Sequence, residues 1–92
     1  LYRQAVATGE YGAVTRAYYA VMAEVIEEAY GSSWHFCPPD QKGQSREEAT
    51  HRLHARIARL LQLSPGKTAV DIGCGIGGAL RDIVVETGAR VH

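Results

Sequence analysis

The residues best suited to chemistry are a carboxylate and a group of glycines late in the chain. Asp71 lies near the end of a short apolar run, and four glycines follow it between residues 73 and 78. An amphipathic segment, 79–87, comes next. This order predicts a strand, a tight loop and a helix, which open a nucleotide-binding α/β unit. Gly73 permits a sharp exit from the strand, and Gly75 lets a ligand approach the backbone without meeting a Cβ atom.

The glycine spacing alone leaves the ligand open. Gly73, Gly75 and Gly78 fit the G-x-G-x-x-G pattern of NAD-binding folds, and a purely structural glycine turn also fits. Asp71 favours another ligand, because a fixed anion beside a pyrophosphate is unfavourable. A carboxylate two residues before the first glycine resembles motif I of class I S-adenosylmethionine (SAM)-dependent methyltransferases, in which it helps to fix the methionine ammonium. The resemblance implies that SAM contacts Asp71, Ile72, Gly73, Cys74, Gly75, Gly77 and Gly78.

The composition excludes several classes of protein. With 46% hydrophobic and 22% charged residues, the chain is globular and not disordered. Ten basic residues balance ten acidic ones, which gives no reason to expect a nucleic-acid partner. No apolar run is long enough for a membrane span, and no signal-peptide pattern is present. Cys37 and Cys74 are too few for a disulfide framework, so we expect a reducing, cytoplasmic setting.

The chain begins at Leu1 and stops at His92, just where a second strand is expected. One β-α-β start cannot cover both faces of a parallel sheet. We therefore expect an α/β fold in which helices precede the start of a Rossmann-like methyltransferase domain, truncated, and a piece that is inactive alone. The predicted division is a helical, substrate-side segment at 1–44 and the beginning of the SAM-binding domain at 45–92.

Apolar periodicity predicts three helices in this order. The first covers 13–29 and ends at Gly31; the second begins at a Ser45–Glu48 capping box; the third covers 79–87 and ends at Gly88. Strands are expected at 68–72 and 89–91, parallel to each other. The buried stripe of the second helix is predicted as Ala49, Leu53, Ile57, Leu60 and Leu61. The third helix is expected to turn Leu80, Ile83, Val84 and Thr87 to the sheet and Arg81, Asp82 and Glu86 to solvent.

Trp34, His35 and Phe36 lie in the irregular segment 31–43, which contains paired prolines. A loop gains nothing by exposing apolar rings to water, so these side chains either plug the core or line a ligand pocket.

A metal site is a weaker interpretation of the same region. His35 lies near Cys37, and His51 and His54 are three residues apart on the next helix. These residues do not form a ligand set at the spacing that zinc requires, so we expect no metal.

Three blocks narrow the resemblance to the sterol 24-C-methyltransferase branch. They are Val14-Thr15 with Tyr18-Tyr19, the segment 31–36, which is similar to that family's Gly-x-Ser-Phe-His-Phe, and residues 63–78 with the helix beyond them. The run 25–30 departs from the family, since Ile26 and Glu28 replace aromatic residues. The substrate that the resemblance implies is a sterol, with another isoprenoid, lipid or natural product left open.

The resemblance also implies a mechanism, in which a methyl group passes from SAM to an alkene carbon and the resulting cation loses a proton. The implied catalytic residues are Glu27, Tyr30, Trp34 and His35. Tyr30 and Trp34, with Phe36, would offer π-faces and Glu27 a negative charge to the cation, while His35 is either a base or a hydrogen-bonded core residue. O- or N-methylation of another small molecule and a non-catalytic SAM-binding module are the alternatives.

Overall fold

The computed structural model describes all 92 residues and divides them into two compact units, Leu1–Gly31 and Ser32–His92. The division falls before residues 32–40, called the aromatic segment below, and not after them. Trp34 and His35 therefore belong to the same unit as residues 73–78, called the glycine loop. The functional division expected at residue 45 stays a prediction.

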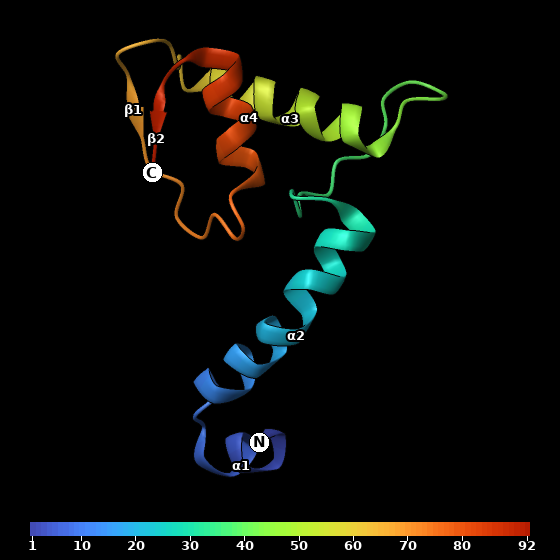
Figure 1. Cartoon of the computed structure of the whole chain (residues 1–92), viewed down its shortest axis with the longest axis vertical. Helices are drawn as coiled ribbons and strands as arrows, with labels where there is room; N and C mark the ends of the chain where they lie inside the picture. Colours follow the sequence, from blue (N-terminus) through green and yellow to red (C-terminus); the bar gives the residue numbers. More distant parts are fainter. The chain divides into compact units, whose positions relative to one another are not determined.

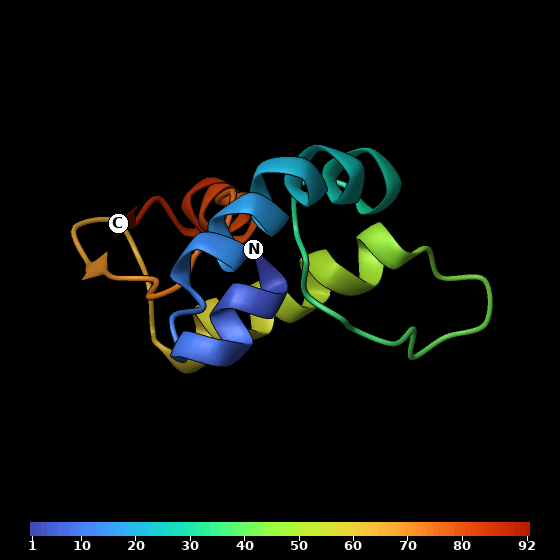
Figure 2. The same ribbon diagram turned by 90° about the horizontal axis from the view of Figure 1, so that it is seen from below.

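The first unit consists of two helices, α1 (Tyr2–Thr8) and α2 (Gly12–Tyr30), which contact each other (Figures 1 and 2). The predicted 13–29 helix is confirmed with one more residue at each end. Gly31 ends it, and its N–H donates to the Glu27 carbonyl at 2.8 Å. No helix of the protein has both the length and the apolar character needed to cross a membrane.

The second unit contains α3 (Arg46–Leu60), β1 (Thr68–Ala69), α4 (Gly78–Thr87) and β2 (Arg90–Val91). The capping box that begins α3 is confirmed: the Glu48 N–H donates to Ser45 Oγ at 3.1 Å, and the Ser45 N–H donates to Glu48 Oε2 at 2.7 Å. The bond from the Ser45 backbone, followed by that from its side chain, lowers the pKa of Glu48 below its ordinary value.

The two strands are parallel, as expected, and pair Thr68 with Arg90 and Ala69 with Val91. Both are shorter than predicted, because each has only the other as a partner. A further ladder bond joins the Asp71 N–H to the His92 carbonyl at 2.8 Å. The two strands and the helix α4 between them form a single β-α-β unit, which is the part of the expected α/β fold that is observed.

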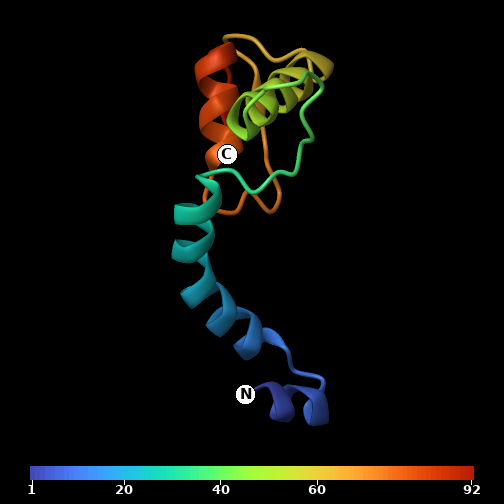
Figure 3. The same cartoon turned by 90° about the vertical axis from the view of Figure 1, so that its right-hand side faces the viewer.

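The core of the second unit lies between α3 and α4, which pack side by side (Figure 3). Its buried apolar residues are Ala49, Ala58, Ala79, Ile83 and Ala89. The predicted stripe on α3 is wrong in part, because Leu60 and Leu61 are exposed while Thr50 and His54 are buried. The helix is therefore turned so that Thr50, His54 and Ala58, each four residues apart, face inward. The predicted solvent face of α4 is wrong at Asp82, which packs against α3.

Candidate functional site

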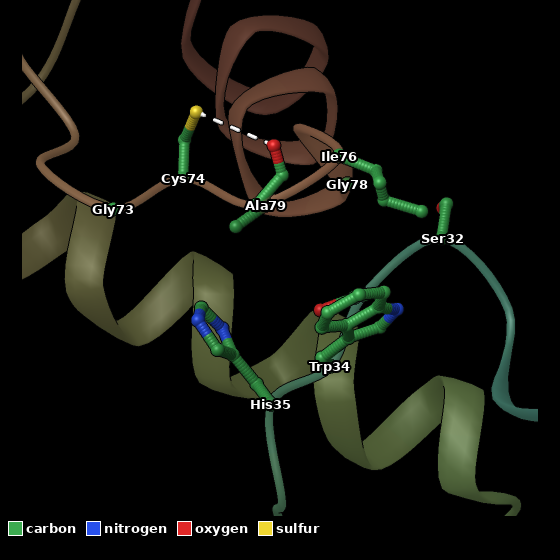
Figure 4. A pocket seen from close by; sticks show the side chains of 10 residues that line it. Ser32, Trp34, His35, Gly73, Cys74, Ile76, Gly78 and Ala79 are labelled. Carbon is green, nitrogen blue, oxygen red and sulfur yellow. Dashed lines mark hydrogen bonds between the residues drawn. The ribbon is translucent and has the colours of Figure 1, made fainter. Parts of the chain in front are cut away.

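A small cavity lies between the aromatic segment and the glycine loop, both in the second unit. Figure 4 shows Trp34 and His35 on one side and Gly73, Cys74 and Ala79 on the other. The cavity measures about 110 Å³, below the roughly 300–1,000 Å³ of pockets that enclose a drug-sized ligand. It can therefore hold part of a larger ligand. The lining residues are Ser32, Ser33, Trp34, His35, Gly73, Cys74, Gly75, Ile76, Gly78 and Ala79.

The glycine loop is shaped by its backbone. Gly73 and Gly75 have φ of 84° and 58°, in the left-handed region that favours glycine, and a Cβ on either would meet nothing within 4 Å. Gly78 is constrained differently, because a Cβ there would lie 2.0 Å from the Ser32 carbonyl oxygen. Glycine at 78 thus lets the segment that begins at Ser32 cross the start of α4.

Four of the predicted cofactor residues, Gly73, Cys74, Gly75 and Gly78, line the cavity. Gly77 caps the start of α4 beside them. Asp71 and Ile72 lie just before the cavity in sequence and do not line it; Ile72 is 94% exposed. The half-buried Asp71 carboxylate makes no hydrogen bond to another group of the protein, which leaves it free to bind a cation. The contacts of these seven residues with SAM stay a prediction.

The wall opposite the loop is held by a chain of hydrogen bonds between side chains. Asp82 Oδ2 on α4 lies 2.6 Å from His54 Nδ1 on α3. His54 Nε2 in turn lies 2.8 Å from His35 Nδ1, with the two rings edge to face at a centroid distance of 5.0 Å. Ser33 Oγ is a second, more distant neighbour of His54 Nε2, at 3.3 Å. His54 is 1% exposed, so this chain runs from the interior of the unit to the cavity.

The aromatic segment is tied to both helices of the unit. Arg81 on α4 donates to Ser32 Oγ at 2.7 Å, and Arg46 on α3 donates to the Ser33 carbonyl at 3.3 Å. At the other end, Arg52 donates to the Pro38 carbonyl at 3.0 Å and forms an ion pair with Asp40.

The four predicted catalytic residues fall in different units. Trp34 and His35 line the cavity, as the pocket interpretation requires, whereas Phe36 is 88% exposed and faces a separate open depression beside the prolines. Glu27 and Tyr30 lie on the last turn of α2 in the first unit, and both are exposed. A catalytic role for these residues stays a prediction.

Sequence reasoning missed the partnership of His54 with Asp82 and the cavity-lining positions of Ile76 and Ala79. The His54 signal was available, since a histidine four residues from both Thr50 and Ala58 shares their helix face. Asp82 had no comparable signal, because its neighbours in sequence are charged or apolar residues of an ordinary amphipathic helix. No group of three or more His, Cys, Asp or Glu side chains is arranged to hold a metal ion.

Comparison with known proteins finds that the chain is similar to enzymes named as sterol C-methyltransferases. The chain is 47% identical over 91 residues to the sterol 4-C-methyltransferase strm-1 of Caenorhabditis elegans, a match that covers 99% of this chain and 27% of the relative. It is 39% identical over 74 residues to 24-methylenesterol C-methyltransferase 2 of Oryza sativa subsp. japonica, covering 80% of this chain and 20% of the relative. It is 37% identical over 84 residues to sterol 24-C-methyltransferase ERG6B of Gibberella zeae, covering 91% and 22%.

The resemblance to the sterol C-methyltransferase branch is thereby confirmed. The chain spans 27%, 20% and 22% of the lengths of these three relatives. No family model matches the chain, and no solved structure matches it.

Proposed function

We propose that the full-length protein carrying this chain is a SAM-dependent sterol C-methyltransferase, and that the second unit contains the beginning of its Rossmann-like cofactor domain. One observation carries the proposal: the glycine loop faces Trp34 and His35 across a cavity, in a chain similar to sterol C-methyltransferases. Under this proposal, the glycine loop holds the cofactor next to side chains suited to carbocation chemistry.

The residues present fit the amino-acid part of SAM. Gly73 and Gly75 carry no Cβ atom to shield the loop backbone, and Gly78 and Ala79 at the N-terminus of α4, the end of a helix that favours anionic groups, line the same cavity. The Asp71 carboxylate is free to bind the methionine ammonium, and the cavity volume suits a part of the cofactor, not the whole. When bound, SAM supplies an electrophilic methyl group.

The opposite wall would serve the sterol. Transfer of a methyl cation from the sulfonium to one carbon of a sterol alkene leaves a positive charge on the sterol, which must lose a proton before the product is neutral. The Trp34 ring offers a π-face that stabilises positive charge on the sterol, and a basic His35 ring nitrogen can take the proton. A role for Tyr30 and Glu27 of the first unit in the same reaction stays a prediction.

We place the methyl group at sterol carbon 4. The relatives include enzymes named for carbon 4 and for carbon 24, and the match to the carbon-4 enzyme has the higher identity and covers almost the whole chain. The run 25–30 also lacks two of the aromatic residues that the resemblance to the 24-C branch implies, with Ile26 and Glu28 in their places.

The cofactor is tested by calorimetric titration of the full-length protein with S-adenosylhomocysteine, with NADH as the control ligand. We expect micromolar binding of S-adenosylhomocysteine, at least a tenfold loss in Asp71→Ala, and no change in Glu86→Ala, which removes an exposed carboxylate of α4. Binding of NADH instead would show that the glycine loop binds a dinucleotide and would overturn the proposal.

The acceptor is tested by incubation with sterols and SAM that carries a deuterated methyl group. Mass spectrometry and NMR of the product should locate the label on carbon 4. A label on carbon 24 would show that carbon 24, and not carbon 4, receives the methyl group. A label on oxygen or nitrogen would overturn C-methylation. Cofactor binding without any labelled product would favour a non-catalytic SAM-binding module.

A further inference from the structure

The His35 ring is joined to the interior by two side chains that the proposed reaction does not itself touch. Asp82, His54 and His35 form one continuous chain, with contacts of 2.6 Å and 2.8 Å. We propose that Asp82 and His54 are positioning residues that fix the tautomer of His35 and leave its Nε2 atom ready to take the proton. The inference rests on the proposed function, since it assigns the proton acceptor of that reaction.

Proton counting along the chain decides the tautomer. An ionised Asp82 carboxylate can only accept, so His54 Nδ1 must carry the hydrogen of the 2.6 Å contact. A neutral His54 then has a lone pair on Nε2, and His35 Nδ1 must donate to it across 2.8 Å. The remaining His35 nitrogen, Nε2, therefore has no hydrogen and can act as a base.

The surroundings of the two ends support this assignment. His35 lines the cavity and is exposed, and its Nε2 makes no hydrogen bond to the protein. His54 is 1% exposed and Asp82 has 18% side-chain exposure, so water competes little for their contact. When His35 Nε2 takes a proton, the charge of the imidazolium is offset through His54 by the Asp82 carboxylate, as in other carboxylate–histidine pairs.

His51 offers a matched control, because it contacts the same Asp82 carboxylate. His51 Nδ1 also contacts Asp82 Oδ2, at 2.9 Å, but its side chain is 54% exposed and makes no hydrogen bond to His35. Removing His51 takes away one histidine partner of Asp82 without breaking the chain to the cavity. Comparing the His54 and His51 variants therefore distinguishes a role in positioning His35 from a general link between α3 and α4.

The test uses the full-length protein with four variants: His35→Gln, His54→Gln, Asp82→Asn and His51→Gln. We expect His35→Gln to lower kcat by about a hundredfold to ten-thousandfold, the range of general acid–base catalysis, and His54→Gln and Asp82→Asn to lower it by at least about tenfold. The Kd of S-adenosylhomocysteine and the KM for sterol should stay within about twofold, and His51→Gln should keep kcat within about twofold. Asp82→Asn retains the shape of the side chain, so it carries the test if His54→Gln does not fold.

The tautomer is read directly from the side-chain nitrogen shifts of the protein labelled with 15N-histidine. We expect His35 to carry its hydrogen on Nδ1 in the wild type and in His51→Gln, and to shift towards the Nε2–H form in Asp82→Asn, since an asparagine can either donate or accept. A wild-type His35 with its hydrogen on Nε2 would overturn the inference, as would equal kcat values for Asp82→Asn and His51→Gln. A wild type without methyl transfer would instead overturn the proposed function.

Discussion

The two walls of the cavity are built in opposite ways. The loop wall depends on the backbone: Gly73 and Gly75 hold left-handed conformations, and Gly78 leaves room for a crossing segment. The facing wall depends on side chains from three separate places, His35, His54 and Asp82, linked by hydrogen bonds. The first wall should therefore be damaged by adding a single carbon atom, and the second by changing a proton donor or acceptor with hardly any change of volume.

The largest effect is expected on the loop wall, from Gly78→Ala. Its Cβ would lie 2.0 Å from the Ser32 carbonyl oxygen, a backbone atom that can move only with its segment. We expect the free energy of unfolding to fall by about 1–3 kcal/mol, measured by denaturant titration of the full-length protein, and S-adenosylhomocysteine to bind at least tenfold more weakly. Gly12→Ala is the control, since its Cβ would meet only the end of the Arg16 side chain at 3.4 Å. Equal stability of the two variants would contradict a crowded contact at residue 78.

The side-chain wall is probed by a double-mutant cycle between His54→Gln and Asp82→Asn. Because the pair is shielded from water, we expect a coupling energy of about 1–2 kcal/mol. The same cycle between His51→Gln and Asp82→Asn should give less than about 0.5 kcal/mol, because His51 is half exposed. Similar coupling energies in both cycles would show that the buried His54–Asp82 contact is no stronger than the exposed His51–Asp82 contact.

Gly75→Ala separates conformational strain from crowding within the loop wall. Its Cβ would enter open space, but φ is 58°. A loss of about 1 kcal/mol in unfolding free energy is expected from the left-handed conformation alone. Gly75→Asn should lose less, since asparagine tolerates this region better than alanine. A loss as large as that of Gly78→Ala would mean that the space beside Gly75 is filled.

The smallest effect is expected at the start of α3, outside both walls. The folded state lowers the pKa of Glu48, so the carboxylate stabilises the fold above the ordinary value of 4.5, and this contribution disappears as the pH falls through the lowered folded value. We expect Glu48→Gln to melt below the wild type at pH 6 to 7, with a gap that closes as the pH approaches 3. A gap that stayed constant with pH would rule out the charge as its source.

The sequence predicted the loop wall well because its signals are local. Positive φ at Gly73 and Gly75, the capping box at Ser45 and the end of α2 at Gly31 each depend on residues within one turn of the chain. The hydrogen bonds between Asp82 and His54 and between His54 and His35 join residues that are 28 and 19 positions apart in sequence. No periodic pattern therefore indicates them. A rotation of α3 that buries His54 in place of Leu60 was equally hidden, because polarity alone favours the neighbouring, more apolar face.

The two anchors of the aromatic segment also limit how its length can vary. Ser32 is held to α4 by Arg81 and by the close contact at Gly78, while Pro38 and Asp40 are held to α3 by Arg52. An insertion between these anchors would push Trp34 or His35 out of register with the cavity. Residues 41–43, which lie beyond the second anchor and are exposed, can absorb extra residues without that cost. Length variation among relatives is therefore expected after Asp40, while the distance in sequence from Ser32 to Pro38 stays constant.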